Sequence, residues 1–170
     1  MTGRSAGATA RLHRKLLLWV GYSGLLRRWG PRLLPRLDLW TYRRTNGRWM
    51  PSRLLRPVAV LHTVSRDGTP RLTPLLADRD SSGGFLVVAT NFGRTRHPRW
   101  SDRLLRDPRA VINWRGTSVR VRARQLTPQE QDAARGRILQ LMPPFDAYAE
   151  RSHRKVRVFL LTPLTSGEKT

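Results

Sequence analysis

One segment in the second half of the chain alternates strictly between apolar and charged residues, and this alternation constrains the fold more than any other feature. Within Ser118–Leu126, one face of an extended chain would carry small apolar side chains and the other arginines: Val119, Val121 and Ala123 against Arg120, Arg122 and Arg124. Successive side chains of a β-strand point to opposite faces of its sheet. The segment therefore predicts an antiparallel strand that is buried on one side and basic on the other.

Other segments of the same region have the composition of strands: Val58–Val64, Arg71–Ala77, Phe85–Thr90, Ala110–Trp114 and Val156–Leu161. Asp67-Gly68 separates the first two of them, and Arg115-Gly116 lies before the alternating segment. Asp-Gly between two apolar runs predicts a hairpin with a type I′ turn, in which both central residues have positive φ.

Helices are expected between these strands. The first lies around Trp100 and Leu104. A capping box, Thr127-Pro128-Gln129-Glu130, predicts the start of a second helix that continues to about Met142. A shorter helix is expected over Phe145–Ser152. Mainly antiparallel strands with inserted helices predict an α+β fold built as a small, partly open barrel.

The chain is strongly basic, and the excess is greatest at its front. Its 170 residues include 33 lysines and arginines against 11 acids, a net charge of +22. Residues 1–56 hold 13 of these bases and a single acid, Asp38. This imbalance favours contact with an anionic partner, such as a nucleic acid, an acidic membrane surface or a phosphorylated ligand. Arginine enrichment through coding bias is the alternative.

The front of the chain is expected to be helical without crossing a membrane. Its longest apolar run, Leu16–Val20, is far shorter than the roughly 20 residues that a spanning helix needs. Apolar residues can instead form one face with bases around it: Leu12, Leu16, Trp19, Val20, Leu25 and Leu26. We expect a cytoplasmic protein whose residues 1–36 either lie on the anionic inner face of the cell membrane or pack on their own domain.

The pattern changes near residue 54, and this predicts the domain organisation. Residues 1–53 form a basic helical extension, in which Leu37–Arg44 makes one or two helical turns before Asn46-Gly47. Residues 54–165 form the barrel domain, and residues 166–170 a disordered tail. The oligomeric state is left open.

Several common chemistries are absent from the sequence. There is no cysteine, which excludes disulfides, zinc–thiolate sites and thiol catalysis. The four histidines, His13, His62, His97 and His153, show no metal-binding spacing, so no metal site is expected. No GxSxG, Walker loop or GxGxxG is present. An enzyme of this composition would take its reactivity from an organic cofactor.

Two blocks of sequence resemble a known family. The first runs from the Val60 strand through Ser65-Arg66-Asp67-Gly68 to Arg71-Leu72-Thr73-Pro74-Leu75. The second joins Val87–Asn91 to His97-Pro98-Arg99-Trp100. Their order and spacing resemble the deazaflavin-dependent nitroreductase and quinone reductase family, and the resemblance covers about residues 37–163. It implies a split β-barrel of the FMN-binding type and coenzyme F420 as the cofactor.

The resemblance also implies an activity and a set of site residues. The activity is hydride transfer from the reduced deazaflavin to a small electrophile such as a quinone or a nitro compound. Tyr148 is expected to donate a proton or to hydrogen-bond the substrate. The implied cofactor-binding residues are Arg66, Asp67, Arg71, Leu72, Thr73, Pro74, Leu75, Leu76, Val88, Ala89, Thr90, Asn91, Arg99, Trp100, Ser101, Asp102, Arg103 and Phe145.

Two departures from the family pattern keep other functions open. Asp67 stands in a loop where the family has a lysine, and Arg103 stands where it usually has asparagine. One alternative is a split-barrel protein that binds FMN or another flavin, or that has lost catalysis. Another is an arginine-rich nucleic-acid-binding protein. It is disfavoured because acids interleave with the arginines and no recognition motif is present.

Overall fold

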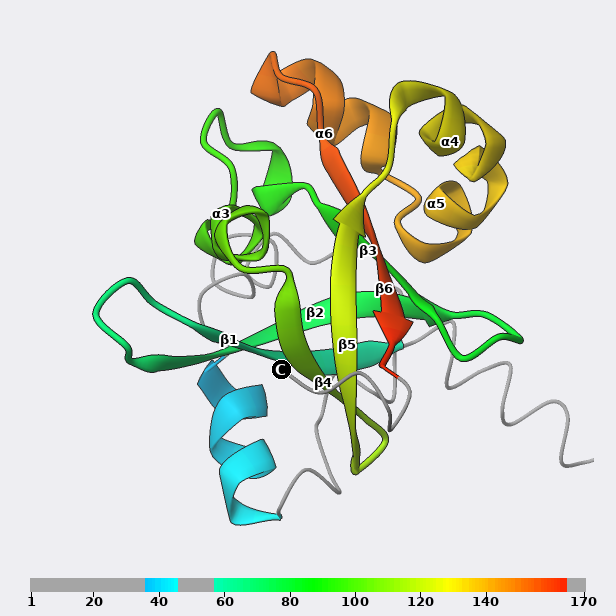
Figure 1. Ribbon diagram of the computed structural model, residues 1–170. Helices are drawn as coiled ribbons and strands as arrows, with labels where there is room; N and C mark the ends of the chain where they lie inside the picture. The colour runs from blue at the N-terminus through cyan, green and yellow to red at the C-terminus, as the bar shows by residue number, and fades with distance from the viewer. Residues whose placement is uncertain (1–35, 46–56, 165–170) are drawn as a thin grey trace, which may run out of the picture.

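The computed structural model describes residues 36–45 and 57–164, and six β-strands form its centre (Figure 1). The strands are β1 (Val58–Val64), β2 (Pro70–Arg79), β3 (Phe85–Ala89), β4 (Arg109–Trp114), β5 (Thr117–Gln125) and β6 (Arg157–Pro163). The helices are η2 (Asn91–Gly93), α3 (Arg99–Arg106), α4 (Pro128–Ala133), α5 (Arg135–Leu141) and α6 (Phe145–Ser152). A further helix covers residues 36–44.

The strands form a closed antiparallel barrel in the order β1-β2-β3-β6-β5-β4. β1 closes it, because this strand pairs along one edge with β2 and along the other with β4, where Leu61 lies opposite Ile112. The antiparallel barrel with inserted helices is confirmed, but the expectation that it is partly open is wrong. Strand patterns do not reveal closure, since the β1–β4 contact joins segments that are far apart in the sequence.

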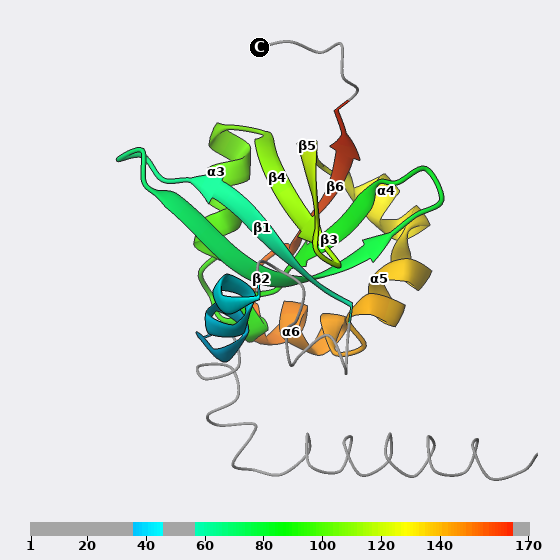
Figure 2. The same ribbon diagram turned by 90° about the horizontal axis from the view of Figure 1, so that it is seen from below.

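Apolar side chains fill the barrel and also cover its outside. Inside, Phe85, Ile112 and Phe159 are at most 1% exposed. Outside, Ile138 and Leu141 of α5 pack with Leu86 and Val158 of the neighbouring strands. Helices α4 and α5 lie along one side of the barrel, as seen from below (Figure 2). The arrangement explains the sequence pattern, because central strands that are buried on both faces are apolar throughout.

The helix over residues 36–44 packs on the barrel. Its Tyr42 lies against Val58 and Val60 of β1, and the Tyr42 hydroxyl is 2.9 Å from Nε2 of His62. The predicted helical turns at Leu37–Arg44 are thus confirmed. Almost all of the segment expected to contact lipid, the turn at Asn46-Gly47, the boundary near residue 54 and the tail 166–170 lie outside the described residues. Within the described part, no helix has both the length and the apolar character needed to cross a bilayer.

One of the two predicted hairpin turns differs from the prediction, and the other is confirmed. Val64 pairs with Pro70, so residues 65–69 form the loop, and only Gly68 in it has a positive φ, of 77°. The type I′ turn predicted at Asp67-Gly68 is therefore wrong. Arg115-Gly116 has the geometry of that turn instead, with φ of 51° and 90° between the paired Trp114 and Thr117. Loop length decides the turn type, since only a two-residue connection requires both positive angles.

The capping box is confirmed, but the helix that it starts is shorter than expected. Thr127 accepts a hydrogen bond from the Glu130 N–H while the Glu130 carboxylate accepts one from the Thr127 N–H. α4 ends at Ala133 and α5 begins at Arg135, so a single helix to Met142 is wrong. No proline lies at the break itself, which falls at Ala134. We attribute the break to Gly136, a poor helix former, and to the burial of the α5 apolar residues on the barrel.

Candidate functional site

A hollow of about 600 Å³ opens where the loop between β1 and β2 faces helix α3. The loop and the helix contribute all of its lining residues, which are Ser65, Arg66, Asp67, Arg99, Asp102, Arg103 and Arg106. Four arginines against two aspartates leave the lining with an excess of positive charge. The hollow is therefore suited to an anionic molecule.

Helix α3 presents arginines to the hollow because of their spacing. Arg99, Arg103 and Arg106 lie four and three positions apart and so share one face of the helix. Trp100 and Leu104 occupy the opposite face and are buried in the barrel, where the Trp100 and Phe159 ring centroids are 5.8 Å apart. Burial of the apolar face thus orients the basic face toward the β1–β2 loop.

Arg103 is the most enclosed cation of the hollow. Its Nε donates to the Thr63 hydroxyl at 2.7 Å, and its Nη2 lies 3.4 Å from the Thr73 hydroxyl. Burial lowers the pKa of Arg103 below its ordinary value, and the nearby cations Arg71, Arg106 and Arg99 lower it further. These cations repel one another, so a bound anion would stabilise all of them.

Both acids of the lining interact with groups of the chain itself. The Asp67 carboxylate accepts a hydrogen bond from the Thr69 N–H at 3.0 Å and lies 3.9 Å from Arg71. The hydrogen bonds from Thr69 are the main reason that the pKa of Asp67 is lowered. The Asp102 carboxylate lies 2.6 Å from Nη1 of Arg157. Asp67 is therefore a negative charge of the lining with Arg71 nearby, and Arg157 of β6 balances Asp102.

The structure brings part of the predicted site together. Arg66, Asp67, Arg99, Asp102 and Arg103 line the hollow. Arg71 and Thr73 adjoin it, because Arg71 donates to the Ser65 hydroxyl at 2.9 Å and Thr73 contacts Arg103. Ser65 and Arg106 also line the hollow and were not predicted. Helical spacing from Arg99 and Arg103 is the signal that would have found Arg106.

The remaining predicted residues lie away from the hollow. On β2, Leu75 packs with the barrel interior, Leu72 and Leu76 pack with the cluster around Tyr42, and Pro74 pairs with Val60. On β3, Val88 and Ala89 are buried, as are Thr90, Trp100 and Ser101, and Asn91 begins the left-handed turn η2. Their contacts with a cofactor stay predictions.

Phe145 and Tyr148 lie on α6, on another side of the barrel from the hollow. Phe145 packs with the buried cluster under α5, and the Arg151 guanidinium lies 5.1 Å from the centre of the Tyr148 ring. Neither residue lines the hollow. The role of Tyr148 as a proton donor therefore stays a prediction, because Tyr148 does not line this hollow.

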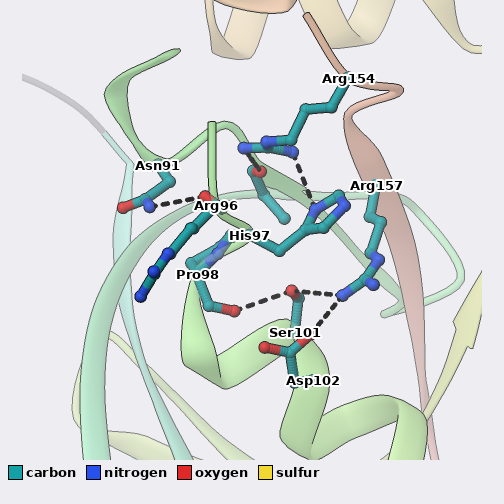
Figure 3. A network of polar contacts seen from close by, with 9 residues as sticks. Asn91, Arg96, His97, Pro98, Ser101, Asp102, Arg154 and Arg157 are labelled. Atoms are coloured by element: carbon teal, nitrogen blue, oxygen red, sulfur yellow. Dashed lines mark hydrogen bonds and ion pairs between the residues drawn. The ribbon is translucent and has the colours of Figure 1, made fainter. Parts of the chain in front are cut away.

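A polar network joins the end of β3 to the start of α3, and sequence reasoning missed its two central residues (Figure 3). Arg154 and Arg157 come from the end of the chain and contact the loop after β3 and the first turn of α3. No local sequence pattern predicts these contacts, because the partners of both arginines lie more than fifty positions earlier in the sequence.

Solved structures share the fold of this barrel. An F420H2-dependent reductase aligns with a TM-score of 0.57 at 23% identity, over 62% of this chain and 94% of that one. A domain-swapped dimer aligns with a TM-score of 0.59 at 22% identity, over 81% and 96% of the two chains. At these identities the likeness shows a shared fold, a split barrel, and nothing more.

Sequence similarity identifies the family. The F420H2-dependent quinone reductase family matches residues 34–163. A protein of Mycobacterium tuberculosis described as an F420H2-dependent quinone reductase is 34% identical over 141 residues, 78% of this chain and 91% of its own. The chain therefore belongs to the F420H2-dependent quinone reductase family. Membership makes it a deazaflavin-dependent oxidoreductase with coenzyme F420 as cofactor and quinones as acceptors.

Proposed function

We propose that the hollow between the β1–β2 loop and α3 binds the anionic part of coenzyme F420. The cofactor carries a phosphodiester and a polyglutamate tail, so it needs a basic site. The crowding of Arg103 by three other arginines carries this proposal, because burial and their repulsion lower the pKa of Arg103 and a bound anion would relieve that repulsion. Arg66 and Arg99 at the edge of the hollow add two further donors that can bind phosphate or carboxylate in a bidentate manner.

In the reaction that we propose, the protein binds the cofactor and the acceptor, orients them toward each other and excludes water from them. Coenzyme F420, when bound, supplies the hydride. Arg103 is held by Thr63 and Thr73, which fixes the position of the anionic group. A quinone also needs a proton to become a hydroquinone, and Tyr148 is our candidate donor. Nitro compounds are a second acceptor class that the same transfer would reduce.

The proposal is tested by titrating the purified protein with oxidised F420 and following the fluorescence of the cofactor. Saturable quenching that weakens as salt is raised is expected, because salt screens exposed charges. Absence of quenching at about 100 μM, a binding free energy weaker than about −5.5 kcal/mol, would contradict it. A yellow preparation that carries FMN would instead identify the alternative flavin.

Asp67→Asn is expected to tighten F420 binding about twofold to fivefold. Asparagine keeps an oxygen that can accept the Thr69 N–H, so the loop should persist while a negative charge leaves the hollow. Asp132→Asn on α4, an exposed position outside the hollow, makes the same charge change as a control. Equal effects of the two substitutions would show that net charge alone is responsible.

We also propose that the basic front of the chain contacts anionic lipid. The proposal is supported by its 13 bases and single acid over residues 1–56 and by the apolar residues among them, such as Trp19. Removing residues 1–35 leaves the helix over 36–44 in place and is expected to abolish sedimentation with vesicles that contain phosphatidylglycerol. Unchanged sedimentation of the shortened chain would disprove the lipid contact.

A further inference from the structure

One guanidinium group holds most of the connection between β3 and α3. Nη2 of Arg154 donates to the carbonyl oxygens of Ala89 at 3.1 Å and Thr90 at 2.8 Å, and its Nε donates to the Arg94 carbonyl at 3.1 Å. Its Nη1 lies 2.8 Å from Nδ1 of His97. Figure 3 shows Arg154 above the connection with the His97 ring turned toward it. All four acceptors lie between residues 89 and 97.

This arrangement sets the protonation state of His97. Arginine only donates hydrogen bonds, so Nδ1 of His97 must accept, and the imidazole must be neutral with its proton on Nε2. The charged groups around the ring are Arg154, Arg157 and Asp102. Burial, followed by the two arginines, lowers the pKa of His97, while Asp102 acts in the opposite direction. The ring is therefore neutral at pH 7.

The connection needs outside support because its backbone is strained. Asn91, Phe92 and Gly93 are three consecutive residues with positive φ, of 49°, 56° and 70°. Non-glycine residues seldom adopt this conformation, and it persists only where surrounding contacts enforce it. The contacts come from Arg154, from Arg151, which donates to the Phe92 carbonyl, and from the Asn91 side chain, which donates to the Arg96 carbonyl.

The same connection determines where α3 begins. Pro98 follows His97, and its carbonyl accepts hydrogen bonds from the N–H and the hydroxyl of Ser101. Arg157 then binds the Ser101 hydroxyl at 3.2 Å and the Asp102 carboxylate at 2.6 Å. The arginines that line the hollow lie on this helix, so a shift of its first turn would move them.

We propose that Arg154 is a positioning residue for the hollow. It holds the strained connection and the start of α3 in place. One of the hydrogen bonds by which it does so ends on Nδ1 of His97, which can accept it only while the ring is neutral. Protonation of His97 removes the acceptor and places a third positive charge beside Arg154 and Arg157, so the connection loosens and the hollow loses its arrangement. The effect on cofactor binding rests on the proposed function. The effect on the connection does not.

The direction of the pH effect follows from the protonation states. The lowered pKa of His97 means that folding favours the neutral ring. The connection is fully held above the ordinary histidine pKa of about 6.5 and loosens as pH falls through the lower value of the folded protein. Both hydrogen exchange of the connection and F420 affinity should therefore change between about pH 8 and about pH 5.

His97→Asn tests the proposal, because asparagine places an oxygen near the position of Nδ1 that accepts without being protonated. Amide hydrogen exchange of residues 89–98 is compared at each pH between the full-length wild type and the variant. We expect exchange in the wild type to rise on acidification relative to the variant, and F420 affinity to fall about tenfold in the wild type only. The same acid dependence in both proteins would overturn the proposal.

Arg154→Lys supplies the second arm, because a lysine cannot reach four acceptors at once. It is expected to raise exchange in residues 89–98 at every pH and to abolish the pH dependence. Arg120→Lys on the exposed face of β5 is the matched control and should behave as wild type. Equal behaviour of the two lysine variants would overturn the role of Arg154. A wild type that fails to bind F420 at pH 8 would refute the proposed function, while the exchange comparison would still decide this inference.

Discussion

An Arg103→Met variant is expected to bind coenzyme F420 about 10- to 100-fold more weakly than wild type, while its free energy of unfolding stays nearly unchanged. The loss of affinity follows from the removal of charge-assisted hydrogen bonds to the anion, each of which contributes about 1.5–3 kcal/mol. Arg103 is the most enclosed of the arginines in the hollow and is held by two threonine hydroxyls.

Stability is expected to change little because two opposing effects apply. The variant loses the hydrogen bonds to Thr63 and Thr73, which lowers its stability because the hydroxyl of the buried Thr63 loses a donor. It also loses a cation that burial and the neighbouring Arg71, Arg106 and Arg99 destabilise. Binding residues often lower the stability of the free protein in this way.

Fluorescence titration with F420 and urea unfolding would measure the two effects in the same preparations. Arg120→Met, at an exposed position of β5 that does not line the hollow, removes the same charge and serves as the control. We expect the control to match wild type in both measurements. If Arg103→Met also bound F420 as wild type does, the hollow would not be the anion site.

The strands of the barrel could be predicted because each leaves a local mark. The alternation in Ser118–Leu126 matches β5, where Val121 and Ala123 are buried while Arg120, Arg122 and Arg124 are exposed. The capping box at Thr127 also acts locally and was predicted correctly. Features of this kind depend on residues within a few positions of one another.

Closure of the barrel and the break between α4 and α5 could not be predicted, because both depend on distant contacts. Leu61 lies opposite Ile112 only in the folded chain, and no sequence pattern in either strand predicts that the two strands pair. The left-handed turn at Asn91–Gly93 has the same origin. Arginines that follow far along the sequence hold it in place.

The hollow was predicted in part, and for a specific reason. Arg66 and Asp67 were found through their place in a family motif, and Arg99 and Arg103 through a second one. Arg106 lies outside both motifs and was missed, although it shares the face of α3 with the other two arginines. Arg154 and Arg157 were missed because their contribution depends on which part of the chain they meet.

Phe159→Ala is expected to destabilise the protein by about 3–5 kcal/mol, a large share of the roughly 5–15 kcal/mol that stabilise a typical domain. Phe159 is 1% exposed inside the barrel and contributes to both edges of β6, opposite Val87 on β3 and Gln125 on β5. Its removal leaves a cavity that the closed barrel cannot collapse to fill. Urea unfolding of the purified variant measures the loss.

The same substitution should also weaken F420 binding, because Phe159 supports the helix that carries the hollow. Its ring lies against Trp100, on the face of α3 opposite the arginines, with 5.8 Å between the ring centroids. Leu105→Ala, at a position of α3 that is 49% exposed, should change stability by no more than about 0.5 kcal/mol and leave binding unchanged. If Phe159→Ala lowered stability but bound F420 with wild-type affinity, the orientation of α3 would not depend on its packing in the barrel, and polar contacts such as those of Arg103 with Thr63 and of Arg157 with Asp102 would have to position the arginines of the hollow.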